Sequence, residues 1–128
     1  YIYGTSSAYA MNNTIDSNMI TDFYYFGVYS YYQENLNING NTIVQNSTTP
    51  YSTGYGIYNY YGDFSSVVGN TIKLYATGTN YGIYNYFCDA SAASPNLIAN
   101  NMVSCAGNTG TTYGIYPYNN YYTDIVLQ

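Results

Sequence analysis

The sequence predicts an all-β fold, a single-domain parallel β-solenoid whose coils of about 29 residues stack along one axis. Two recurring phrases and a strand-like composition favour this class. The first phrase occurs four times, as FGVYSYY at 26–32, YGIYNYY at 55–61, YGIYNYF at 81–87 and YGIYPYN at 113–119. One such unit cannot bury its apolar face alone, so we expect about four coils to share one core.

A second phrase keeps step with the first, as NTI at 13–15, 41–43 and 70–72 and as NNM at 100–102. Its apolar residues lie 28, 29 and 30 residues apart. We therefore divide the single domain, residues 1–128, into units of approximately 1–25, 26–54, 55–80, 81–112 and 113–128. The alignment begins and ends within a unit, which favours a segment of a longer solenoid over a subunit that stacks end to end.

The units are expected to be strands. Segments such as YGIYNYY and NTIKL are short and rich in Tyr, Ile and Thr, and clusters of Gly, Asn, Ser and Thr separate them. No window shows the apolar spacing of an amphipathic helix. Two or three strands with their turns fill one coil, and each coil advances the stack by about 4.8 Å.

Aligning the units predicts which side chains form columns along the stack. Two aliphatic columns are expected to face the core: Val28, Ile57, Ile83 and Ile115 in one, and Ile15, Ile43, Ile72 and Met102 in the other. An amide ladder is expected at an inward corner, formed by Asn13, Asn41, Asn70 and Asn100. Such ladders satisfy buried amides and resist register slip.

Period-two alternation places two Tyr columns on the outer face. The first contains Tyr29, Tyr58, Tyr84 and Tyr116, and the second contains Tyr31, Tyr60, Tyr86 and Tyr118. The same alternation points a Gly column outward, at Gly27, Gly56, Gly82 and Gly114. Three interpretations of the Tyr face stay open: lateral assembly, carbohydrate binding, and a simple preference for Tyr in strands that meet water.

Tandem G-[IV]-Y and G-N-T-I phrases at this spacing resemble the right-handed parallel β-helix repeat regions of secreted bacterial surface and fibre proteins. The resemblance covers essentially the whole chain. It implies the parallel β-helix fold and an extracellular or cell-surface location. Because pectin-degrading enzymes, adhesins and stalk modules share this architecture, it implies no particular activity.

Composition excludes several classes of function. The chain has no His, a single cationic side chain (Lys73) and a net charge of −5, so it offers no basic patch to nucleic acid. No apolar run approaches the ~18 residues of a membrane span. Without His, neither a Ser-His-Asp or Cys-His site nor a His-ligated metal can be assembled. We therefore expect no enzyme activity and no cofactor.

Three acidic residues share one register on adjacent coils: Glu34, Asp63 and Asp89, with Tyr121 at the fourth position. Carboxylates about 5 Å apart raise one another's pKa or attract a cation. The column is therefore read in three ways: a solvated turn that favours acids, a cation site such as a Ca²⁺ site, or an acid–base pair of the glycosidase kind.

The only two cysteines, Cys88 and Cys105, lie in the unit that carries an insertion at 90–95. Outside a reducing compartment such a pair favours a disulfide, here closing a loop of ~17 residues and contributing ~3 kcal/mol. Two free buried thiols are the alternative.

Together these features favour a non-enzymatic structural module of an extracellular fibre, stalk or adhesin that presents Tyr ladders. Its expected partners are other copies or the adjoining coils of a longer chain, and polysaccharide is the alternative partner. The alternative function is a carbohydrate-binding or polysaccharide-cleaving β-helix that uses the Tyr face and the column Glu34, Asp63 and Asp89.

Overall fold

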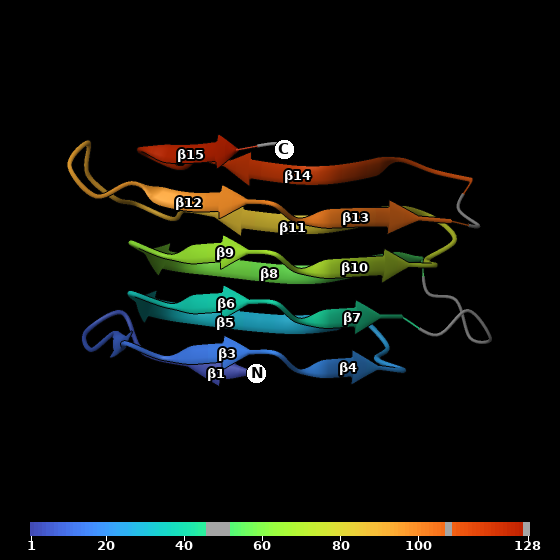
Figure 1. Ribbon diagram of the computed structural model, residues 1–128, viewed down its shortest axis with the longest axis horizontal. Coiled ribbons are helices and arrows are strands. Elements are labelled where there is room, and N and C mark those ends of the chain that lie inside the picture. The colour runs from blue at the N-terminus through green and yellow to red at the C-terminus, as the bar shows by residue number, and fades with distance from the viewer. Residues whose placement is uncertain (46–51, 107–108, 127–128) are drawn as a thin grey trace.

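The computed structural model describes residues 1–45, 52–106 and 109–126, and within these ranges the chain forms strands and no helix. The described residues contain fifteen strands in three sheets, and these strands pair in parallel. Figure 1 shows the coils stacked along one axis, from the N-terminus at the bottom to the C-terminus at the top. The predicted all-β parallel solenoid of about four coils is confirmed.

The first sheet, which we call the long sheet, contains the longest strand of each coil. Its members are β1 (Ile2–Tyr3), β5 (Phe26–Glu34), β8 (Thr53–Asp63), β11 (Thr79–Tyr86) and β14 (Thr112–Tyr118), with β2 (Ala10–Met11) paired to β5. The opposite side of the coils carries short strands in line, one to the left and one to the right in Figure 1, except in the top coil, where the described residues form the left-hand strand alone.

The left-hand short strands form the second sheet: β3 (Thr14–Asp16), β6 (Asn37–Asn39), β9 (Ser66–Val68), β12 (Asn96–Ala99) and β15 (Thr123–Val126). The right-hand short strands form the third sheet: β4 (Met19–Thr21), β7 (Thr42–Val44), β10 (Thr71–Leu74) and β13 (Met102–Cys105). The core lies between the long sheet and these two sheets.

The first aliphatic column lies in the long sheet and faces this core. Val28 pairs with Ile57, Ile57 with Ile83, and Ile83 with Ile115. Val28, Ile57 and Ile83 are buried, with 4 % or less of their surface exposed. Burying an aliphatic side chain of this size stabilises the fold by about 1.5–3 kcal/mol relative to leaving it exposed.

The second aliphatic column differs from the prediction at both ends. Ile43 and Ile72 are paired and fully buried, but their neighbours along the third sheet are Ile20 and Val103. The residue predicted at the first position, Ile15, pairs with Ile38 in the second sheet.

The predicted fourth member, Met102, pairs with Thr71 and is 60 % exposed. Neither Ile15 nor Met102 therefore belongs to the predicted column, and Met102 does not face the core, whereas Ile15 does pack against it. The NTI phrase at 13–15 belongs to a different side of the coil, and the Asn pair at 100–101 shifts the last unit by one residue.

The amide ladder exists, with the same shift at its ends. The side-chain nitrogen of Asn41 donates to Oδ1 of Asn70 at 2.9 Å, and that of Asn70 donates to Oδ1 of Asn101 at 2.9 Å. Below them, Asn18 donates to Oδ1 of Asn41 at 3.1 Å. The ladder therefore stands at the corner between the second and third sheets.

The prediction that Asn13 and Asn100 belong to this ladder is wrong. Asn13 donates instead to Oε1 of Gln33 at 2.9 Å, on the other side of the coil. Asn100 is exposed with a φ of 53°, and it occupies the turn position that Gly40 and Gly69 fill, also with positive φ. Asn tolerates this left-handed backbone better than most residues do, which is why it replaces Gly there.

The long strands bend at the Gly column, and the prediction that these glycines face outward is wrong. Gly56 is buried, and a methyl group on it would contact the side chain of Ile72 and the carbonyl of Gly82. Gly56 and Ile57 therefore both face the core, while Tyr55 and Tyr58 on either side are half-buried. Strict period-two alternation fails at this bend.

Candidate functional site

The outer face of the long sheet is covered by aromatic columns, and it is the candidate functional surface. In the first predicted column the ring centroids of Tyr29, Tyr58, Tyr84 and Tyr116 lie 5.3, 4.9 and 5.3 Å apart in succession. In the second, those of Tyr31, Tyr60, Tyr86 and Tyr118 lie 5.0, 4.8 and 5.3 Å apart. Each column runs parallel to the axis of the stack.

A third column was missed by sequence reasoning. It contains Phe26, Tyr55, Tyr81 and Tyr113, with centroids 5.1, 4.8 and 4.9 Å apart. These residues precede the Gly column by one position, so alternation had placed them inward. The bend at Gly turns them outward, and the repeated aromatic-Gly pair was the available signal.

A fourth column lies where the long strands end. Tyr32, Tyr61 and Phe87 stack with centroids 4.7 and 5.4 Å apart, and their φ angles are 49°, 50° and 51°. The left-handed backbone turns each ring to the outer face beside its chain neighbour, which is uncommon for an aromatic residue. The doubled aromatics at 31–32, 60–61 and 86–87 were the sequence signal for this column.

The Tyr rings of neighbouring coils stack face to face. Between β8 and β11 the paired rings are within 13° of parallel at 4.8–4.9 Å. Rings this close and this parallel overlap as an offset stack, because they are too near to lie side by side in one plane. Each such pair contributes about 0.5–1.5 kcal/mol beyond its area burial. The outer face therefore presents mainly ring edges and hydroxyl groups.

Packing also keeps the phenols neutral. Burial among neighbouring rings, and then the charge of those neighbours, raises the pKa of Tyr84 to about 12. The pKa of Tyr60 is raised to about 12 by burial first and then by its hydrogen bond with Tyr61. The pKa of Tyr58 is raised by the same kind of burial. The aromatic face is thus uncharged at neutral pH.

The acidic column lies at the turn that follows the long strands. Glu34 pairs with Asp63, and the backbone N–H of Asp89 donates to Oδ1 of Asp63 at 2.9 Å. Burial raises the pKa of Asp63, the hydrogen bond from Asp89 opposes this, and the charges of Asp89 and Glu34 raise it further. The fourth residue of that register, Tyr121, is 67 % exposed.

The Tyr9 ring lies beside this turn, with its centroid 5.3 Å from that of Tyr32. Burial and then the charge of Asp63 raise the pKa of Tyr9 to about 12. In the described residues, no three His, Cys, Asp or Glu side chains come together closely enough to hold a metal ion. Glu34, Asp63 and Asp89 thus do not gather as a three-carboxylate cluster, and the cation site stays a prediction.

Comparison with known proteins agrees with the coil architecture. Residues 1–72 match the family model described as the right handed beta helix region. The chain belongs to this family. No curated protein and no solved structure matches it. The resemblance to right-handed β-helix repeat regions is thereby confirmed, and a secreted bacterial origin stays a prediction.

The two cysteines of this β-helix do not form a disulfide; both are free. Cys88 is buried just after β11, where its thiol donates to the carbonyl of Asn59 at 3.3 Å. Cys105 ends β13, in register with Leu74. The predicted disulfide is wrong because the ends of β11 and β13 lie at opposite ends of the coil (Figure 1). Burial raises the pKa of Cys88 to about 12, so its thiol is protonated.

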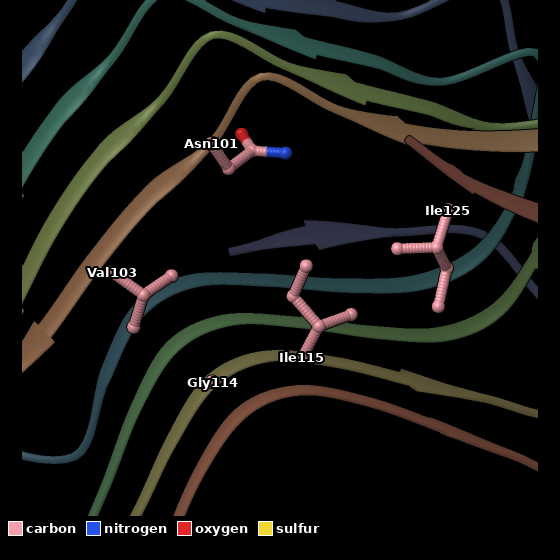
Figure 2. A pocket seen from close by; sticks show the side chains of 5 residues that line it. All are labelled: Asn101, Val103, Gly114, Ile115 and Ile125. Carbon is pink, nitrogen blue, oxygen red and sulfur yellow. The ribbon is translucent and has the colours of Figure 1, made fainter. Parts of the chain in front are cut away.

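The C-terminal end of the β-helix exposes its interior. A hollow of about 460 Å³ is lined by Asn101, Val103, Gly114, Ile115 and Ile125. Figure 2 shows Val103, Ile115 and Ile125 pointing into the same space, each from a different sheet. These side chains are the last described members of the inward columns, and β13, β14 and β15 are edge strands.

No described segment forms a helix long and apolar enough to cross a membrane.

Proposed function

We propose that this right-handed β-helix is a non-enzymatic structural module of an extracellular or cell-surface fibre, stalk or adhesin. Its function is to add rigid length and to present Tyr ladders. The adjoining coils come from a longer chain or from further copies that stack end to end. Nucleic acid is not among the proposed partners, because the net charge is −5 and the chain offers no basic patch.

The observation that carries this proposal is the open end. Val103, Ile115 and Ile125 line an apolar hollow in the last described coil, and Ile125 is 41 % exposed. Unpaired strand edges are templates for pairing, and exposed apolar columns favour a partner that continues them. A further coil would pair these strand edges and also cover the exposed apolar columns.

The composition and the outer face support a structural function over a catalytic one. The chain has no His and one cationic side chain, and the faces of its central Tyr rings are covered by other rings. Sugar-binding platforms need free ring faces, whereas this surface offers edges and hydroxyl groups. Such a surface favours contact with a second polar, aromatic surface, as in lateral assembly.

Sedimentation of the purified chain tests the proposal. Ile125→Asp places a charge in the open end and is expected to abolish self-association. Lys73→Asp is the matched control, because Lys73 is exposed on β10 in the middle of the stack and away from both ends. Association that persists in the Ile125 variant and is lost in the control would point to lateral contacts. No association in the unmodified chain would contradict the end-to-end arrangement.

The second candidate is a polysaccharide-binding or polysaccharide-cleaving β-helix. It is favoured by the raised pKa of Asp63 beside Glu34, next to the aromatic column at the strand ends. Asp63→Asn tests it, since Asn still accepts the N–H of Asp89 but cannot carry charge or a transferable proton. Cleavage of a glycan library by the unmodified chain, lost in this variant, would replace the structural proposal.

A further inference from the structure

Three Tyr pairs lie side by side at the boundary between β8 and β11. Their ring centroids are 4.8 Å apart for Tyr55 and Tyr81, 4.9 Å for Tyr58 and Tyr84, and 4.8 Å for Tyr60 and Tyr86. The interplanar angles are 5°, 9° and 13°. Each pair is also a register pair of the two parallel strands. The two rings of a pair are therefore near copies of one another, shifted by one coil.

This arrangement holds equivalent atoms of the two phenols close together. Because the rings are nearly parallel, the ortho carbons Cε of one ring lie about one strand spacing, ~4.8 Å, from those of the other. All six side chains are half-buried on the outer face, so solvent reaches them. Coupling requires the side chains to rotate out of the stack until two Cε atoms come into bonding range.

We propose that these three pairs are sites of oxidative cross-linking, in which dityrosine bonds join one coil to the next. The oxidant class is hydrogen peroxide used by a haem peroxidase. Each phenol loses its O–H hydrogen, the two phenoxyl radicals join through a Cε–Cε bond, and the hydrogens displaced from the two Cε atoms return to the oxygens. Two phenols and one hydrogen peroxide thus give one biphenol and two water molecules.

The surroundings favour coupling within the chain over escape of the radical. A partner phenol held in place converts a bimolecular encounter into a unimolecular step. The raised pKa of Tyr58, Tyr60 and Tyr84 keeps these phenols protonated, so the proton leaves together with the electron. Several other pairs in the same columns are less well aligned, such as Tyr29 with Tyr58 at 68° and Tyr84 with Tyr116 at 43°. Tyr81 with Tyr113, at 4.9 Å and 10°, is as well aligned, but both of its rings lie in the same tryptic fragment.

The cross-link would fasten neighbouring coils covalently on the face opposite the two short sheets. A role for this cross-link in stiffening the module rests on the proposed structural function. The coupling of the Tyr pairs itself does not depend on that function. The following experiment uses dilute, monomeric protein, so its result is independent of whether the chain forms filaments or binds glycan.

Lys73 provides a clean readout, because it is the only Lys or Arg of the chain. Trypsin therefore cuts the unfolded protein into 1–73 and 74–128. Tyr55, Tyr58 and Tyr60 lie in the first fragment, and their partners lie in the second. Both cysteines lie in the second fragment, so no disulfide within one chain can join the two.

The protein is treated with a haem peroxidase and hydrogen peroxide, quenched, and the monomer fraction is isolated by size in denaturant. It is then reduced, cut with trypsin and analysed by denaturing gel and mass spectrometry. We expect the two fragments to stay joined, with a mass two hydrogens below their sum for each bond formed. Fragments that separate completely after oxidation would overturn the proposal.

Two matched triple variants locate the bonds. Tyr81→Phe, Tyr84→Phe and Tyr86→Phe together keep the rings but remove the partner phenols, and the joined band should be lost. Tyr113→Phe, Tyr116→Phe and Tyr118→Phe remove as many phenols from β14, within the second fragment, and the joined band should remain. Equal joining in both variants, or joining that is as strong when oxidation is done in urea, would overturn the assignment to these pairs.

Discussion

The side-chain nitrogen of Asn41 donates to Oδ1 of Asn70 one coil above it, and the same oxygen accepts the backbone N–H of Asn41. Both distances are 2.9 Å, and both residues are 1 % exposed. One oxygen therefore satisfies two buried donors and fixes the register of two coils.

Removing a ladder amide should be costly, because it leaves buried donors unpaired. Asn70→Ala is expected to lower the free energy of unfolding by about 1–3 kcal/mol, as measured by urea denaturation. Asn13→Ala, which loses the side-chain hydrogen bond to Gln33, should cost less. An equal decrease in the free energy of unfolding in the two variants would show that the corner ladder stabilises the fold no more than the Asn13–Gln33 hydrogen bond does.

The bend at the Gly column gives a second prediction. Gly56→Ala places a methyl group against Ile72 and the carbonyl of Gly82, and overpacking of this kind costs about 1–3 kcal/mol. Gly114→Ala is the matched control, since nothing lies within 4 Å of the added methyl group. Thermal unfolding should separate the two variants; a Gly56 variant as stable as the control would contradict the inward bend.

Asn59 and Asn85 occupy neighbouring positions of one inward column, and both are fully buried. The side chain of Asn59 accepts from Ser30 at 2.7 Å and donates to Ser65 at 2.9 Å. Neither the side-chain nitrogen nor the side-chain oxygen of Asn85 has a hydrogen-bond partner among the described residues.

Asn85→Leu should therefore be neutral or stabilising, whereas Asn59→Leu should cost about 1–3 kcal/mol. Urea denaturation of the two variants measures the difference. A larger loss at Asn85 than at Asn59 would refute this ordering.

The raised phenol pKa values predict alkaline destabilisation. Between the ordinary value of 10.0 and about 12, Tyr60 and Tyr84 keep their protons in the folded state but lose them in the unfolded state. The folded state then binds more protons, so stability is complete below pH 10 and falls as the pH rises through this window. Titrating phenolate absorbance in native and urea-unfolded protein checks this. Coincident curves would show that the rings are not packed as described.

Repetition made much of this structure predictable. Val28, Ile57 and Ile83 could be aligned from the recurring phrase alone, because a parallel stack places equivalent residues one above another. The outer position of Tyr58 and Tyr84 followed from their distance to those residues. The acids Glu34 and Asp63 were likewise brought to one turn.

The errors came from features that depend on packing. A Gly such as Gly56 could be read as outward by alternation, and only the contact with Ile72 shows that the strand bends there. The NTI at 13–15 matched later copies in letters but lies on another side of the coil, because corner lengths vary between units. Separation of Cys88 from Cys105 likewise depends on where each strand ends, which spacing does not encode.

We propose that this β-helix is a stacking structural module with aromatic columns along its side. Electron microscopy of the purified chain checks this stacking. Uniform filaments, one coil wide or laterally paired, with an axial repeat of about 4.8 Å are the expected result. Discrete, monodisperse particles that cleave a polysaccharide would contradict it.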